Sequence, residues 1–161
     1  MSSGGERGGR DPKPKDGMTA AQFQALIDDH LPIAHWLGFT VTEMGVGKAT
    51  VEMPFRQEFV RPGGTVAGPM MMALADCAMY GAVLAGDPAA IMAVTSNLSI
   101  HFLRGAKPAA LVAEAELLRL GRRLAVVEVT LHSKGEAKPV AHVTGTYALP
   151  DPESRGAAAV P

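Results

Sequence analysis

Asp76 is the only charged residue in a long apolar stretch from Pro69 to Ala85, which reads PMMMALADCAMYGAVLA. An ionised carboxylate is costly to bury, so a natural sequence seldom keeps one in such a setting without a partner or a function. A carboxylate in an apolar wall can take a proton from water or attack an electrophile, as a catalytic base or nucleophile does. The alternative is a structural carboxylate that only accepts hydrogen bonds from backbone or hydroxyl groups.

The stretch around Asp76 predicts a helix that is buried on most faces. Val83 is its only β-branched residue, and its apolar side chains leave no polar face. Pro69 suits the first turn, where its missing N–H costs nothing, and Gly86 lies at the expected end. On such a helix Cys77 points about 100° away from Asp76. We therefore interpret Cys77 as a packing residue and not as a nucleophile.

The remaining elements are a short helix and six strands. Apolar residues at helical spacing predict the short helix from the N-cap Thr19 to His30, closed by Pro32. A hairpin over 39–54, with its turn at 45–47, comes before the buried helix. After the helix, alternating apolar and polar residues predict strands with one face on the helix and one polar face. These strands lie at 93–103, 109–120, 124–133 and beyond the turn at 134–137.

This order predicts an α+β fold in which a curved antiparallel sheet wraps one long central helix. A single copy would leave part of the helix and at least one sheet edge open. Pairing of edge strands across a two-fold axis would close both, so we expect a homodimer. A homotetramer, as a dimer of dimers, could then stack the polar outer faces of the sheets.

Composition limits the classes of function. The 161 residues are 47% hydrophobic and 19% charged, which fits one folded domain at 18–149 between disordered tails at 1–17 and 150–161. The net charge of -1 gives no sign of a nucleic-acid surface. The single cysteine excludes an intramolecular disulfide and a multi-cysteine zinc site. With no signal peptide and no apolar run of roughly 20 residues, we expect a cytoplasmic protein with no membrane or metal partner.

Four segments of the sequence resemble those of a known family. They are the loop GGTVAG at 63–68, the helix segment ALAD at 73–76, the strand segment VTSNLSIHFLR at 94–104 and the turn GRRLA at 121–125. Together they resemble the hot-dog-fold acyl-CoA thioesterases of the phenylacetate-degradation (PaaI-like) type, over about residues 31–149. The resemblance implies hydrolysis of acyl-CoA thioesters to free acid and coenzyme A, with no cofactor other than the coenzyme A of the substrate.

The resemblance also implies catalytic roles. In that family the helix carboxylate, here Asp76, activates water or attacks the thioester, and the N–H at the helix start, here Gly68, polarises the carbonyl. A hydroxyl at the position of Thr95 orients the water. From the residues alone, the alternatives are a turn glycine at Gly68 and a strand residue with a satisfied hydroxyl at Thr95. Gly68 lies eight residues before Asp76, roughly 12 Å along one helix, which is too far for one chain to offer both groups to one carbonyl. The family draws the two groups from opposite subunits, which makes the dimer necessary for activity.

Further residues are candidates for substrate binding. Arginine side chains at strand ends and turns could bind the phosphates of coenzyme A, although solvated turn charges are the alternative for each. Arg61 could instead form a salt bridge to a neighbouring subunit. The substrate-binding candidates are Arg61, Gly64, Ala67, Arg104, Arg122 and Arg123.

Two departures from the family keep an alternative function open. Many members have His-Gly-Gly where this chain has Ala67-Gly68-Pro69, and Asn where it has Arg61. The alternative is a non-catalytic acyl-CoA-binding or structural hot-dog oligomer. Hot-dog dehydratases and hydratases need a histidine paired with the helix carboxylate, and Ala67 argues against that class.

The five histidines are weaker candidates. His101, His132 and His142 fall on the polar phase of their strands, so we expect them to face away from the central helix. His35, beside Trp36, is the candidate for the entrance of the acyl group. No spacing among the histidines favours a metal site.

Overall fold

A computed structural model describes residues 17–155 of the chain. The predicted tails at 1–17 and 150–161 lie outside the described residues, except for Gly17 and the segment 150–155. The elements in chain order are α1 (Ala20–His30), α2 (Pro32–Leu37), β1 (Thr40–Gly45), β2 (Lys48–Met53), the 3-10 helix η1 (Gln57–Phe59), α3 (Gly68–Gly86), β3 (Val94–Phe102), β4 (Leu111–Leu120), β5 (Leu124–Ser133) and β6 (Pro139–Ala148).

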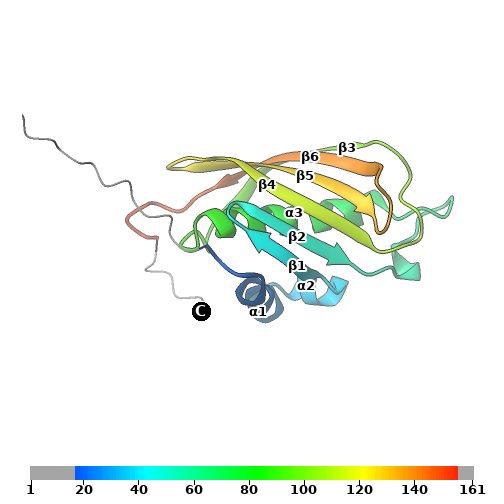
Figure 1. Ribbon diagram of the computed structural model, residues 1–161, viewed down its shortest axis with the longest axis horizontal. Helices are drawn as coiled ribbons and strands as arrows, with labels where there is room; N and C mark the ends of the chain where they lie inside the picture. Colours follow the sequence, from blue (N-terminus) through cyan, green and yellow to red (C-terminus); the bar gives the residue numbers. More distant parts are fainter. Residues whose placement is uncertain (1–16, 156–161) are drawn as a thin grey trace, which may run out of the picture.

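The six strands form one sheet in the order β1-β2-β4-β5-β6-β3, and every neighbouring pair is antiparallel. The sheet curves around α3, while α1 and α2 lie beside β1 (Figure 1). The predicted α+β fold, a curved antiparallel sheet around one long helix, is confirmed. The two edge strands of the sheet are β1 and β3, and β3 directly follows the central helix in sequence.

α3 fills the concave side of the sheet. It spans 19 residues, because it adds Gly68 and Gly86 to the predicted stretch, and by length and composition alone it could cross a membrane. Most of the helix is buried inside the fold, which accounts for its apolar composition. Gly145 on β6 allows this close packing, because a Cβ there would lie 2.1 Å from the Cε of Met79.

The N-terminal helices differ from the expectation. Thr19 caps α1 as predicted, in a capping box with Gln22. α1 ends at His30 as predicted, but Pro32 begins a second helix, α2, which the sequence analysis did not predict. Proline at the first position of a helix loses no hydrogen bond, so it can start a helix as readily as stop one. α2 ends at Gly38, whose φ of 76° is left-handed.

The two edge strands of the sheet differ in how far other residues cover them. At β1, the side chain of Gln24 on α1 accepts a hydrogen bond from the Val41 N–H at 2.7 Å and donates one to the Phe39 carbonyl at 3.2 Å. This side-chain amide closes part of the β1 edge as a further strand would. At β3 most side chains are exposed, Val94 to 61% and Phe102 to 51%. The free edge of the sheet is therefore β3.

Residues 150–155 fold back as a turn against the end of α3. The Arg155 guanidinium forms an ion pair with Asp87, with Nη1 and Oδ2 3.0 Å apart. It also donates to the main-chain carbonyls of Pro150 and Arg122. Both side chains of the ion pair are largely buried, so this turn is part of the folded unit.

Replacing Gln24 should test the closure of the β1 edge. Gln24→Met keeps the length of the side chain but leaves the partly buried Val41 N–H without its acceptor. We expect a loss of about 1–3 kcal/mol in the free energy of unfolding. Urea unfolding measures the loss, and Gln57→Met on the exposed surface of η1 is the matched control. Equal stability of Gln24→Met and the wild type would contradict this role.

Candidate active site

The carboxylate of Asp76 is half-buried on the flank of α3 and is held by two hydroxyl groups. The Oγ1 of Thr95 donates to Oδ1 at 2.7 Å, and the hydroxyl of Tyr147 donates to the same oxygen at 2.8 Å. The Tyr147 hydroxyl also lies 2.9 Å from the main-chain carbonyl of Asp76. Oδ2 accepts no hydrogen bond from residues 17–155, so one carboxylate oxygen is fixed and the other is free.

The two hydroxyl donors come from adjacent strands. Thr95 on β3 and Tyr147 on β6 face each other as cross-strand partners. The pairing of β3 with β6 is irregular between Thr95 and Asn97. Directly opposite residues on one face of a sheet have their Cβ atoms about 5 Å apart, so both side chains can reach a single oxygen on the helix below. The antiparallel register therefore brings both hydroxyl groups to the Asp76 carboxylate.

Tyr147 sits in an aromatic stack. Its ring lies parallel to that of Tyr80, with centroids 6.2 Å apart, and Tyr80 in turn makes an edge contact with Phe23 at 5.6 Å. Burial, and secondly the nearby Asp76 carboxylate, raise the pKa of the Tyr147 hydroxyl well above its usual range. Burial also raises the pKa of Tyr80 to about 12. Tyr147 therefore stays protonated and remains a donor.

A cavity of about 540 Å³ opens beside Asp76. It lies between α3, the N-terminal helices and the segment that leads into β3. Its wall is mostly apolar, with Asp76, Thr95 and Tyr147 as a polar group at one place. The apolar lining residues are Leu26, Ile27, Leu31, Ile33, Phe39, Ala73, Ile91, Met92, Ala93 and Val94. A cavity of this volume accommodates a small organic group next to a carboxylate.

Cys77 also lines this cavity but is only 4% exposed. Burial, and secondly the Asp76 charge, raise the pKa of its thiol to about 12. A thiol with so high a pKa carries little thiolate near neutral pH and is a poor nucleophile. This environment agrees with the interpretation of Cys77 as a packing residue.

Gly68 lies in a different hollow, at the start of α3. The hollow has a volume of about 400 Å³ and is lined by Gly68, Phe102, Arg61 and Arg104 among others. A Cβ at Gly68 would lie only 3.0 Å from the Cζ of Phe102, so glycine leaves room for that ring. Because the next residue is Pro69, which has no N–H, Gly68 supplies the first N–H of the helix. Within one chain this N–H and the Asp76 carboxylate face separate spaces.

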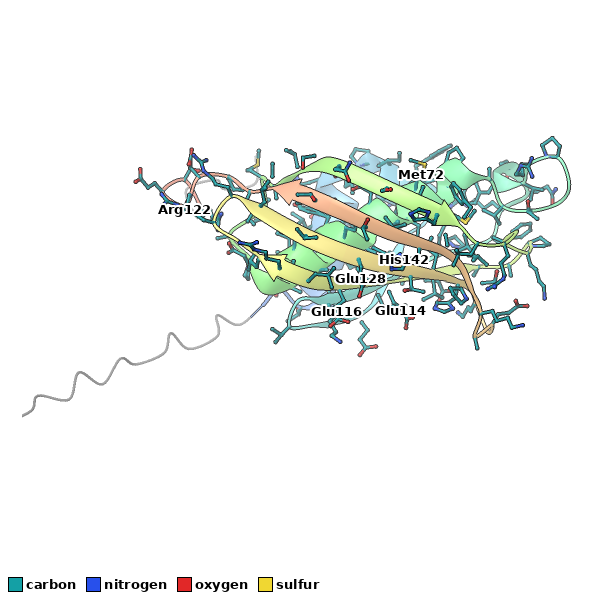
Figure 2. The ribbon with its side chains drawn as sticks, turned by 90° about the horizontal axis from the view of Figure 1, so that it is seen from above. Met72, Glu114, Glu116, Arg122, Glu128 and His142 are labelled. Carbon is teal, nitrogen blue, oxygen red and sulfur yellow. The ribbon has the colours of Figure 1, made fainter. Side chains whose placement is uncertain are left out.

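The other substrate-binding candidates fall in three places. Arg61 and Arg104 border the Gly68 hollow, and Arg104 also donates to the Pro139 carbonyl. Gly64 forms a turn in the preceding loop with φ of 79°, and Ala67 is the N-cap of α3. Arg122 and Arg123 occupy the β4–β5 turn at the opposite end of the sheet (Figures 1 and 2), where Arg123 pairs with Asp151. One chain alone does not bring Arg122 and Arg123 to either hollow.

The histidines on the strands lie apart from the cavity. His132 pairs with Glu114 and His142 with Glu128. Glu114, Glu128 and His142 lie on the outer face of the sheet (Figure 2), as the polar phase of the strands predicted. The expectation for His35 is wrong, because His30 on α1 lines the cavity in its place. The two residues lie on different helices, His30 at the end of α1 and His35 on α2. Among residues 17–155, no three His, Cys, Asp or Glu side chains gather in a position to hold a metal ion.

Sequence reasoning did not identify Tyr147 as a site residue. Tyr147 lies on the buried face of β6, with Ala141 and Val143. A tyrosine hydroxyl on a buried phase needs a partner, and that requirement was the available signal. The partner could not be identified without the strand order, because Asp76 and Tyr147 are far apart in sequence.

Comparisons with known proteins agree on one family. A family model described as the thioesterase superfamily matches residues 63–140. A protein of Saccharolobus solfataricus that is named as a candidate esterase is 33% identical over 97 residues, 60% of this chain and 69% of that protein.

Two solved structures extend the comparison. A candidate thioesterase from a Silicibacter species is 34% identical with a TM-score of 0.75, over 85% of this chain and 95% of its own. A variant of the phenylacetic acid degradation protein PaaI from Thermus thermophilus is 31% identical with a TM-score of 0.66, over 74% of this chain and 99% of its own.

The environment of Cys77 predicts slow reaction with thiol reagents. A pKa of about 12 leaves roughly one thiol in ten thousand ionised at pH 8. We expect dithionitrobenzoate to react with the folded protein at least about 100-fold more slowly than with protein unfolded in urea. Cys77 is the only cysteine of the chain, so the whole signal reports on it. Equal rates in the two states would contradict the raised pKa.

Proposed function

This chain belongs to the thioesterase superfamily and is a thioester hydrolase, and from that premise we propose that it hydrolyses acyl-CoA thioesters with Asp76 as its catalytic carboxylate. In the proposed site, Asp76 acts as general base on water or as nucleophile on the thioester carbon. Thr95 helps to orient the water, and the Gly68 N–H of a partner subunit stabilises the oxyanion. The products are a free carboxylic acid and coenzyme A.

The observation that carries the proposal is a carboxylate with one free oxygen in the wall of an apolar cavity. The cavity offers space for the acyl group, and Oδ2 of Asp76 faces no donor among residues 17–155. In the base route Oδ2 takes a proton from water while the water oxygen attacks the carbonyl carbon. The C–S bond then breaks, and the proton passes from Asp76 to the departing thiolate. The same site without an oxyanion donor would be incomplete.

The position of β3 supports a donor from a second copy of the chain. Thr95, beside Asp76, lies at the start of the free edge strand, and Phe102, against the Gly68 hollow, lies at its end. If two β3 strands pair antiparallel about a two-fold axis near Leu98, the start of one strand faces the end of the other. This pairing would bring Asp76 of one subunit to the Gly68 hollow of its partner.

The exposed surface at this edge is consistent with such a dimer. Met72 on α3 is 40% exposed beside β3 (Figure 2), and Met92 and Val94 next to the cavity are 56% and 61% exposed. Pairing of the β3 edges would cover these apolar side chains and satisfy the outward N–H and C=O groups of the strand. The homodimer then forms one continuous sheet, and no other edge is needed for it.

Coenzyme A has a place in this arrangement. With the acyl group in the cavity of one subunit and the carbonyl at Gly68 of the other, the thiol portion would leave through the Gly68 hollow. Arg61 and Arg104 border that hollow and can pair with the phosphates of coenzyme A. This assignment favours these two arginines over Arg122 and Arg123.

Removal of the Asp76 carboxylate should abolish most of the activity. Asp76→Asn and Asp76→Ala are each expected to lower kcat by roughly 100-fold or more, because neither side chain can act as base or nucleophile. Release of free thiol from a panel of acyl-CoAs measures the rate. Asp29→Asn, an exposed carboxylate on α1, is the matched control and should keep the wild-type rate. Wild-type rates for both Asp76 variants would overturn the assignment, and no turnover of any thioester by the wild type would favour an acyl-CoA-binding role.

Two substitutions at Gly68 distinguish the loss of the N–H from crowding by an added Cβ. Both Gly68→Ala and Gly68→Pro add a Cβ against Phe102, but only proline deletes the N–H. Ala67 has φ of -67° and ψ of 142°, which suits a residue before proline. We expect kcat of Gly68→Pro to be roughly 100-fold below that of Gly68→Ala, because the oxyanion loses its donor. Unfolding curves and chromatography verify that both variants fold and assemble.

Mixed subunits test whether the two groups belong to different chains. Asp76→Asn and Gly68→Pro subunits, each inactive alone, should recover activity when unfolded and refolded together. Each mixed dimer contains one intact site, so an equal mixture should reach about a quarter of the wild-type rate. A mixture as inactive as its components, with mixed dimers demonstrated by two affinity tags, would exclude the cross-subunit site.

A further inference from the structure

Tyr147 is tied to the reactive carboxylate more firmly than Thr95. Its side chain is 3% exposed, and its hydroxyl contacts both the main-chain carbonyl and the Oδ1 of Asp76, at 2.9 and 2.8 Å. A donor that reaches two oxygens of one residue fixes the rotamer of that residue. Thr95 is exposed and lies where the β3–β6 pairing is irregular. Tyr147 is therefore the more rigid of the two donors.

The surroundings of Tyr147 hold its hydroxyl in place. Its ring stacks on Tyr80, whose own hydroxyl donates to the Ile91 carbonyl at 2.8 Å. Phe23 on α1 supports Tyr80 from the other side. Because burial keeps the Tyr147 hydroxyl protonated, it donates to Asp76 throughout the pH range in which an ester hydrolase works.

The two hydroxyls also make the two carboxylate oxygens unequal. Oδ1 accepts two hydrogen bonds, whereas Oδ2 accepts none from residues 17–155. Hydrogen bonds withdraw electron density from the oxygen that accepts them and stabilise the ionised form of the group. The oxygen left for proton transfer or attack is therefore Oδ2, and its direction depends on how firmly Oδ1 is held.

We infer that Tyr147 is a positioning residue of the hydrolase, which fixes Oδ1 of Asp76 so that Oδ2 faces the substrate. This inference rests on the proposed function, since it requires Asp76 to be the catalytic carboxylate. In this role Tyr147 acts through Asp76 and not on the reacting atoms. Its contribution is to orient the carboxylate and to favour its ionised form.

The test is the kinetics of Tyr147→Phe across pH 5 to 9. Loss of one hydrogen bond to an ionised group should lower kcat roughly 10-fold or more and leave KM nearly unchanged. The acid limb of the kcat profile should move to higher pH, because the ionised carboxylate loses a donor. A purely structural role for Tyr147 would not produce that shift.

Matched variants isolate the hydroxyl. Tyr80→Phe removes a hydroxyl from the same stack without touching Asp76, so its acid limb should stay at the wild-type pH whatever happens to KM. Thr95→Val removes the other donor to Oδ1 at an exposed position, and should shift the acid limb in the same direction as Tyr147→Phe. It keeps the inference testable if Tyr147→Phe folds poorly.

Other titratable side chains that line the cavity could also affect the pH profile. Cys77 and Tyr80 on α3 have pKa values raised to about 12 and stay neutral over the range. His30 on α1 is the remaining group that lines the cavity with Asp76, besides Tyr147 on β6. The difference in the acid limb between the wild type and Tyr147→Phe should persist when both proteins also carry His30→Gln, because His30 makes no hydrogen bond to Asp76.

The outcomes separate this inference from the proposed function. If Asp76→Asn is inactive but Tyr147→Phe keeps the wild-type kcat and acid limb, the positioning role is excluded and the function stands. If Asp76→Asn keeps the wild-type rate, the proposed function fails first. A fall in kcat with an unmoved acid limb, equal to that of Tyr80→Phe, would also overturn the inference, because it would show only a disturbed stack.

Discussion

The packing of α3 against the concave face of the sheet sets where every group of the site lies. The contact is close because small residues line it: Ala75, Ala78 and Ala82 are fully buried on the helix. Gly81 meets α1 and β2 so closely that a Cβ would lie 2.8 Å from the Phe23 ring. A helix held this firmly allows little movement of the side chains on its flank, and Asp76 takes its position from that rigidity.

The carboxylate is stabilised by neutral donors and by no cation among residues 17–155. An arginine or lysine partner would form an ion pair and lower the basicity of Asp76. Two hydroxyl groups compensate part of the cost of burial and leave the second oxygen free. An oxygen without a donor among residues 17–155 is what the proposed catalytic role of Asp76 requires.

The same fold leaves one edge of the sheet unfinished. Gln24 closes part of the β1 edge from α1, whereas nothing in the described chain covers β3. Thr95 and Phe102 mark the two ends of this free strand, beside the carboxylate and beside the helix start. The position of the open edge therefore connects assembly and chemistry, because a symmetric pairing there joins the two halves of the proposed site.

Patterns among neighbouring residues were enough to predict most of the local elements and the first candidate site residue. Alternation predicted the strands, the apolar run from Pro69 predicted the central helix, and a lone charge in that run identified Asp76, because periodicity and the cost of a buried charge are properties of neighbouring residues. The helix after Pro32 was missed, since proline can end a helix or begin one. The folded structure was needed to establish the strand order, the free edge at β3 and the contact of Tyr147 with Asp76. These features depend on packing between segments far apart in the chain, which no local pattern records.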